Sequence, residues 1–220
     1  MVHQSLQAAL HKLPQTLFSS RLWLVLFTLL CLSSVAQAKS NILVLGDSLS
    51  AAYGIDPEQG WVALMEQRLN RKARPYQVVN ASISGETSGG GLKRLPKLLD
   101  THNPDIVIIE LGANDGLRGY PLKRMIGNLE QMIRLSQQQN ARVLLAGMKI
   151  PPNYGPIYSL KFEKVYRRLE DQYDIPLIPF FLDNVAGKRE LIQRDGLHPT
   201  AEAQPIILDN VWPYLEPLMD

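Results

Sequence analysis

Residues 41–46 have the sequence Asn-Ile-Leu-Val-Leu-Gly, and Asp47 and Ser48 follow directly. An unbroken apolar run of this length is typical of a strand that is buried on both faces. Further runs of strand length follow at intervals of about 30 residues, over 76–79, 105–109, 142–146 and 176–179. The first run is therefore expected to be one strand of a larger sheet.

Helical patterns separate these runs. They cover residues 61–71, 91–99, 122–138 and 158–172, and a last pattern over 200–218 is interrupted by Pro205 and Pro213. Strands that alternate with helices predict a parallel sheet with helices on both faces. We therefore expect an α/β fold in a single domain, a three-layer sandwich with a central parallel sheet of five strands.

The composition narrows the class of protein. The chain has 220 residues, enough for one ordinary domain. Its content of 45% hydrophobic and 20% charged residues indicates a globular protein. The formal net charge is +2, from 23 basic and 21 acidic residues, so there is no large basic excess to neutralise phosphates. The sequence therefore gives no sign of a nucleic-acid partner.

The first 38 residues differ from the rest, because they contain two basic residues and no acid. An apolar run over residues 22–35 is followed by Ala36-Gln-Ala38, a pattern that predicts a secretory signal peptide with cleavage after Ala38. The run has 14 residues, whereas a membrane-spanning helix needs about 20. We expect residues 39–220 to form a periplasmic domain without a stable membrane anchor.

Several kinds of site are disfavoured. Cys31 is the only cysteine, and it lies in the leader. The small residues expected before a lipid-modified cysteine do not precede it, so no lipoprotein is expected. Because the leader is expected to be removed, the mature chain would have no disulfide and no thiol nucleophile. The glycine-rich stretch 85–91 lacks the lysine of a phosphate-binding loop. Asp47, Asp115 and Asp195 could gather a hard cation, but no acidic cluster or histidine pair accompanies them, and no metal is expected.

Two histidines remain in residues 39–220, and they have different surroundings. His102 follows a helical pattern, where a histidine faces the helix C-terminus favourably, and we expect a structural role. His198 lies in Asp195-Gly-Leu-His-Pro199, where the aspartate can hold one imidazole nitrogen and leave the other free as a base. An aspartate-initiated turn with a surface histidine is the alternative interpretation.

Polar residues and glycines concentrate after the first three predicted strands, and in a parallel sheet these positions lie at one edge. Ser48 is either a helix N-cap or a nucleophile, although the G-x-S-x-G elbow of α/β-hydrolases is absent. Gly85 could bring a backbone N–H close to a ligand, and Asn114 could supply a side-chain amide to an oxyanion. A loop glycine and a turn asparagine are the alternatives.

Four blocks now stand in order along the chain: Gly46-Asp-Ser-Leu49, Gly85, Gly112-Ala-Asn-Asp115 and Asp195-Gly-Leu-His198. Together they resemble the SGNH, or GDSL, hydrolase family over essentially all of residues 39–220. The resemblance implies that Ser48 is the nucleophile, with Gly85 and Asn114 as oxyanion donors. It also implies that His198 is the base and Asp195 its orienting partner.

The stretches 46–55, 112–119 and 195–199 resemble more narrowly the periplasmic members of that family described as acyl-CoA thioesterases, lysophospholipases and arylesterases. That resemblance implies hydrolysis of fatty-acyl thioesters and esters by a monomer that needs no cofactor. It further implies that the loop 115–120 moves over the acyl chain.

The residues themselves suit such a flap and groove. Leu117 and Tyr120, beside two glycines, would form a hinged apolar flap, and Pro151 and Tyr154 could wall an apolar groove. Ordinary loop packing is the alternative for both. Two rival functions remain open: a carbohydrate O-acetyl esterase of the cell envelope, and a non-catalytic envelope protein that binds lipid.

Overall fold

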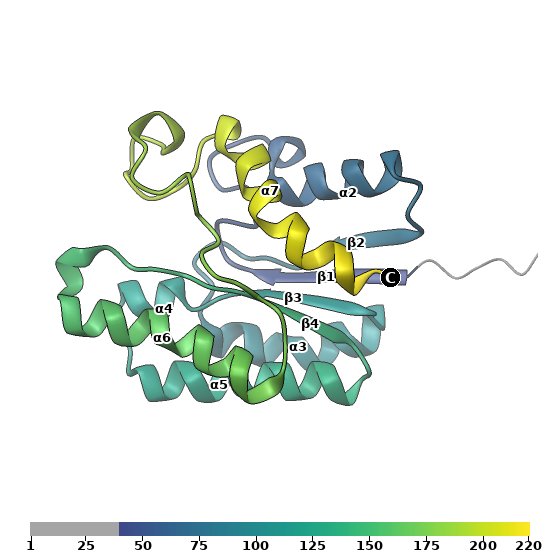
Figure 1. Ribbon diagram of the computed structural model, residues 1–220, viewed down its shortest axis with the longest axis horizontal. Coiled ribbons are helices and arrows are strands. Elements are labelled where there is room, and N and C mark those ends of the chain that lie inside the picture. The colour runs from purple at the N-terminus through teal and green to yellow at the C-terminus, as the bar shows by residue number, and fades with distance from the viewer. Residues whose placement is uncertain (1–39) are drawn as a thin grey trace, which may run out of the picture. The chain divides into compact units, whose positions relative to one another are not determined.

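The computed structural model describes residues 40–220 (Figure 1). The predicted signal peptide, with Cys31, lies outside the described residues. The described residues form one compact unit with its own hydrophobic core. Within that unit, no helix is both long and apolar enough to cross a membrane.

The predicted α/β fold is confirmed. Five parallel strands form one sheet in the order β2-β1-β3-β4-β5. Every residue of the central strand β3 is buried, as its unbroken apolar sequence predicts. The strands are β1 (Ser40–Gly46), β2 (Tyr76–Asn80), β3 (Ile106–Glu110), β4 (Arg142–Ala146) and β5 (Leu177–Ile178).

Helices cover the sheet on both faces. In Figure 1, α2 and α7 lie on one face, and α3, α5 and α6 lie on the other. The helices are α2 (Trp61–Arg71), α3 (Ser88–His102), α4 (Ala113–Leu117), α5 (Leu122–Gln138), α6 (Pro156–Tyr173) and α7 (Gln204–Leu215). Short 3₁₀ turns lie at Pro57–Gln59, Pro152–Tyr154, Arg189–Leu191, Ala201–Ala203 and Glu216–Leu218.

The helix α3 begins three residues earlier than the predicted start at residue 91. Thr87 is its N-cap, and the Thr87 side chain accepts a hydrogen bond from the Gly90 N–H. Gly91 packs directly against Leu111, and an added Cβ would collide with the Leu111 side chain. The last part of the glycine-rich stretch, residues 89–91, thus lies in the first turn of a tightly packed helix.

The order of the strands fixes where a ligand can bind. β1 lies between β2 and β3, so the connections that leave β1 and β3 run to opposite sides of the sheet. Such a switch point opens a crevice at the carboxyl ends of the strands. Gly46 and Glu110, the last residues of β1 and β3, are paired in register at this crevice.

Candidate active site

The turn after β1 places Ser48 at the edge of the sheet. The Asp47 carboxylate accepts a hydrogen bond from the Leu49 N–H at 3.0 Å, and the Asp47 carbonyl accepts one from the Ala51 N–H at 3.0 Å. The chain therefore turns sharply around Ser48, whose side chain is half-buried. Gly46 lets the side chains of Glu110 and Ser50 approach the backbone closely, because an added Cβ would lie 2.7 Å from their atoms.

Ser48, His198 and Asp195 form a continuous chain of hydrogen bonds. His198 Nε2 lies 2.9 Å from Ser48 Oγ, and His198 Nδ1 lies 2.6 Å from Asp195 Oδ2. The structure thus brings Ser48 next to His198, which lies 150 positions later in the sequence. This is the geometry in which an imidazole can take a proton from a hydroxyl.

Asp195 both initiates a turn and holds the imidazole of His198. Its Oδ1 accepts the backbone N–H groups of Leu197 at 2.9 Å and His198 at 3.0 Å, as an aspartate-initiated turn requires. Its Oδ2 holds the imidazole. The backbone N–H of His198, then its side chain and the N–H of Leu197, lower the pKa of Asp195 to about 2. Asp195 is therefore ionised at neutral pH.

The predicted oxyanion donors lie beside Ser48. Gly85 has a φ of +77°, a conformation that glycine adopts without strain. Asn114 stands in the first turn of α4, and its Nδ2 donates to Asp47 Oδ2 at 3.0 Å. None of the hydrogen bonds among residues 40–220 uses the N–H of Ser48 or Gly85 as donor. Both N–H groups are thus free for a ligand.

Two buried carboxyl groups, those of Glu110 and Asp47, hold the turn in place. Glu110 Oε2 accepts the Asp47 N–H at 3.2 Å and the Ser50 hydroxyl at 2.7 Å, and Trp61 Nε1 donates to that hydroxyl at 3.2 Å. Burial raises the pKa of Glu110 well above its usual range. Burial also raises the pKa of Asp47 to about 6, against hydrogen bonds from Leu49 and Asn114 that lower it.

The sequence pattern did not reveal several residues of this network. Glu110 ends an apolar strand, and the sequence suggests Asp47 only as a cation ligand. The Tyr53 ring packs against the His198 imidazole, with ring centroids 4.4 Å apart and planes tilted by 39°. Gln193 donates to the carbonyls of Tyr53 and Pro199, each at 2.8 Å, and so ties the two loops together. No local motif marks these contacts, because they join distant segments.

An apolar pocket of about 350 Å³ opens beside Ser48. Ser48, Gly85, Asn114 and His198 line it, as do Leu117 and Pro151 of the predicted groove. Its other apolar walls are Leu49, Ala113, Met148, Ile150, Leu182 and Leu197.

Tyr120 and Tyr154 of the predicted groove are not among the residues that line this pocket. The Tyr154 hydroxyl instead donates to the Leu117 carbonyl at 3.0 Å, and the Tyr120 carbonyl accepts from the Tyr158 hydroxyl at 3.2 Å. Both tyrosines therefore lie in the segments that brace the outer side of the pocket wall.

In the predicted flap, residues 115–120, Gly116 is not the hinge that the sequence suggests. Residues 113–117 form the helix α4, and the Asp115 carboxylate accepts the N–H and the hydroxyl of Ser88, each at 2.7 Å. An added Cβ at Gly116 would lie 2.6 Å from Phe162 and 2.7 Å from Ile150. Gly116 is thus a packing glycine. Only Gly119, with a φ of +65° and open space around it, has the conformation of a turn.

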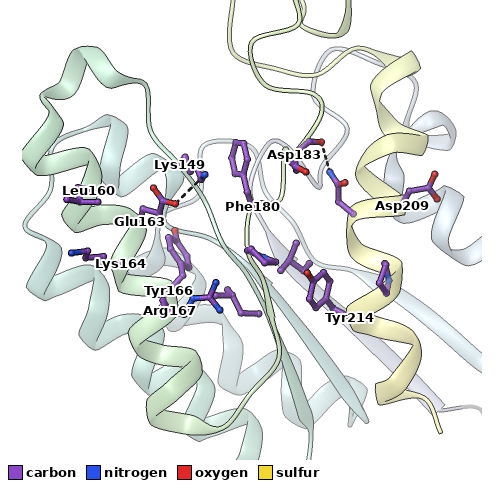
Figure 2. Close-up of a pocket in the computed structure, with 15 residues that line it drawn as sticks. Lys149, Leu160, Glu163, Lys164, Tyr166, Arg167, Phe180, Asp183, Asp209 and Tyr214 are labelled. Carbon is purple, nitrogen blue, oxygen red and sulfur yellow. Dashed lines mark hydrogen bonds and ion pairs between the residues drawn. The ribbon is translucent and has the colours of Figure 1, made fainter.

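A larger depression of about 670 Å³ lies beside β5, between α6 and α7 (Figure 2). Charged side chains line much of it, including an ion pair between Lys149 and Glu163 at 3.3 Å. Its lining contains neither serine nor histidine. The smaller pocket is therefore the candidate active site.

Replacing Asp47 by asparagine should change how stability depends on pH. Between an ordinary aspartate pKa of 3.8 and the raised value of about 6, the folded chain holds a proton that the unfolded chain has lost. Asp47 therefore lowers the free energy of unfolding as pH rises through 6, and Asp47→Asn removes this loss. From pH 4 to pH 8, the variant should gain about 1–3 kcal/mol relative to the unmodified chain.

Urea unfolding at several pH values measures this gap. The matched replacement Asp171→Asn, at an exposed position, controls for the loss of one charge. A gap between Asp47→Asn and the unmodified chain that stays constant from pH 4 to pH 8 would contradict the assignment.

Comparison with known proteins agrees with this geometry. The sequence model of the GDSL-like Lipase/Acylhydrolase family matches residues 44–205. Esterase TesA of Pseudomonas aeruginosa is 50% identical over 190 residues, which cover 86% of this chain and 94% of that protein. Thioesterase 1/protease 1/lysophospholipase L1 of Escherichia coli K12 is 42% identical over 192 residues, which cover 87% and 91%.

A solved structure is similar as well. The crystal structure of the psychrotrophic esterase EstA from Pseudoalteromonas sp., inhibited by monoethylphosphonate, has a TM-score of 0.78 and 46% sequence identity. The match covers 81% of this chain and 97% of that one. A family model that matches most of the chain and relatives of this identity and coverage show that the chain belongs to the GDSL-like lipase/acylhydrolase family of SGNH hydrolases and is an ester or thioester hydrolase.

Proposed function

We propose that this hydrolase cleaves fatty-acyl esters and thioesters through a covalent acyl-enzyme on Ser48. The observation that carries the proposal is the Ser48–His198–Asp195 chain at the wall of an apolar pocket. The nucleophile and its base are within hydrogen-bond distance, and the base is held by a third group. Acyl-CoA, lysophospholipid and aryl esters are the substrates proposed.

In the proposed reaction, His198 Nε2 removes the Ser48 proton as Ser48 Oγ attacks the acyl carbonyl. His198 then protonates the leaving alcohol or thiol, and the acyl group stays on Ser48. A water molecule that His198 deprotonates attacks the acyl-enzyme and releases the fatty acid. Asp195 stays ionised throughout, since its pKa is about 2, and it holds the imidazole in one tautomer.

Three donors would stabilise the negative charge on the carbonyl oxygen. The N–H groups of Ser48 and Gly85 are available, and Asn114 has a second amide hydrogen besides the one that it gives Asp47. The Asp47 carboxylate accepts only, so it forces the amino side of the Asn114 amide, not the carbonyl side, towards Asp47. Asp47 therefore acts as a positioning residue for this donor.

The triad is tested by single substitutions. His198→Ala should abolish turnover, and Asp195→Asn should lower kcat by about 10⁴, the loss measured in a comparable triad, because an amide can hold the wrong tautomer. Asn114→Ala should lower kcat by about 10²–10³ with little change in KM, since its charge partner exists only in the transition state. Steady-state kinetics on a p-nitrophenyl ester give all three values.

The control is His102→Gln, which changes the other described histidine and should leave the rates unchanged. Labelling of Ser48 by a fluorophosphonate, a reagent class akin to the phosphonate bound by the Pseudoalteromonas relative, separates an enzyme from a non-catalytic lipid-binding protein. A folded Asp195→Asn variant with rates within a few-fold of the unmodified enzyme would refute the triad.

The length of the acyl group separates the proposed substrates from those of a carbohydrate O-acetyl esterase. Each methylene group that enters an apolar pocket contributes about 0.8 kcal/mol, a factor of about four in kcat/KM. We expect kcat/KM on p-nitrophenyl esters to rise from the acetyl ester until the acyl chain fills the pocket. A maximum at the acetyl ester would favour the carbohydrate esterase instead.

We also propose that residues 1–38 are a signal peptide and that the enzyme acts in the periplasm. The support is the apolar run before Ala36-Gln-Ala38. The secreted protein should begin Lys39-Ser-Asn41. N-terminal sequencing of the protein from a periplasmic extract checks this, and a sequence from within the leader would be inconsistent with it.

A further inference from the structure

Exposed apolar side chains lie at the pocket and on the segments beside it. In residues 40–220, the large apolar side chains with the highest exposure are Tyr53 (51%), Ile83 (48%), Tyr120 (37%), Tyr154 (38%), Ile157 (71%), Leu160 (53%) and Leu197 (42%). Scattered single residues of this kind are ordinary on a protein surface, but their collection at one place marks an interaction site.

Each of these residues can be placed relative to the pocket. Tyr53 and Leu197 line it, and Ile83 lies next to Ser84, which also lines it. Tyr120 and Tyr154 belong to the bracing segments described above. Tyr154 lines a small open pocket together with Ile157 and Lys161 at the start of α6. Leu160, on the next turn, lines the larger depression between α6 and α7.

The first turns of α6 present a mixed apolar and basic face. Ile157, Leu160, Lys161 and Lys164 are spaced as neighbours on one side of a helix, and Figure 2 shows Leu160 and Lys164 on the same helix. The buried residues of α6 begin with Phe162 and lie on its other side. Long basic side chains next to exposed apolar ones are typical of segments that lie in a lipid interface.

The charge of the chain is concentrated at the same place. Residues 118–124 and 149–164 carry six basic residues and one acid, Glu163, which is paired with Lys149. The rest of residues 40–220 carries 14 basic and 20 acidic residues. These two segments beside the pocket are therefore positive on a protein that is otherwise negative.

Two of these basic residues, Lys123 and Arg124, lie where they do not stabilise their helix. Lys123 and Arg124 stand in the first turn of α5, and neither α5 nor α6 has an acidic residue in its first turn. The N-terminus of a helix carries partial positive charge, so cations there are unfavourable by a few tenths of a kcal/mol each. An external negative partner would account for their position.

We propose that this rim, residues 118–124 and 149–164 with Tyr53, Ile83 and Leu197, docks on the surface of an anionic phospholipid assembly. The apolar side chains enter the interface and the basic side chains contact the headgroups, so that the pocket faces the lipid. The inference rests on the proposed function, because a fatty-acyl substrate would reach the pocket from that surface.

Vesicle co-sedimentation of the processed protein, residues 39–220, tests the proposal. We compare vesicles of phosphatidylglycerol and phosphatidylcholine with vesicles of phosphatidylcholine alone. Binding to the anionic vesicles should be at least tenfold tighter, and 0.5 M NaCl should remove most of this preference, since added salt screens exposed charges.

Two double variants examine the basic and the apolar side chains of the rim separately. Lys161→Glu with Lys164→Glu should weaken binding to anionic vesicles at least tenfold, because each basic residue contributes about fivefold near such a surface. Ile157→Ser with Leu160→Ser should weaken binding to both kinds of vesicle. Lys93→Glu with Lys97→Glu, the same charge change at exposed positions of α3, is the matched control and should bind like the unmodified protein.

Hydrolysis of a monomeric ester, p-nitrophenyl butyrate, is measured in parallel and should be unchanged in all of these variants, because none of the replaced residues lines the pocket. Absence of vesicle binding, or equal binding by the Lys161 and Lys164 double variant, overturns the docking surface even where hydrolysis is normal. Normal vesicle binding without hydrolysis of any ester would instead overturn the proposed function.

Discussion

The turn after β1 depends on two carboxyl groups that are buried together. Glu110 accepts the backbone N–H of Asp47, and Asp47 in turn accepts Leu49 and the amide of Asn114. The bonds run from the end of β3, through the end of β1, to the first turn of α4. One side-chain network thus fixes the positions of Ser48 and Asn114 relative to each other, which backbone pairing between strands cannot do.

Burying this pair has an energetic consequence. Desolvation favours the neutral form of both groups. Above its pKa of about 6, Asp47 is nevertheless ionised at a buried position, and the structure loses some stability for the sake of geometry. Such local conflicts are expected where a fold serves chemistry rather than stability.

The sequence predicts those features that depend on local pattern. The bounds of α2, α5 and β4 agree with the predicted ones, because their apolar spacing is regular over the whole element. The pattern does not predict the start of α3, because glycines are poor helix formers and the contact of Gly91 with Leu111 is not visible in the sequence. The four sequence blocks led to the family and, through it, to residues that meet in space. Tyr53 and Glu110 carry no such signal, since their roles arise only from contacts across the fold.

The strand β5 has only two residues and lies at the edge of the sheet. Pro176 and Pro179 flank it, and a proline has no N–H to donate to a neighbouring strand. An open edge of a parallel sheet is a template on which a second molecule can add its own strand. The two prolines shorten that template to a length at which edge-to-edge pairing between molecules gains almost nothing, so this side of the sheet resists aggregation.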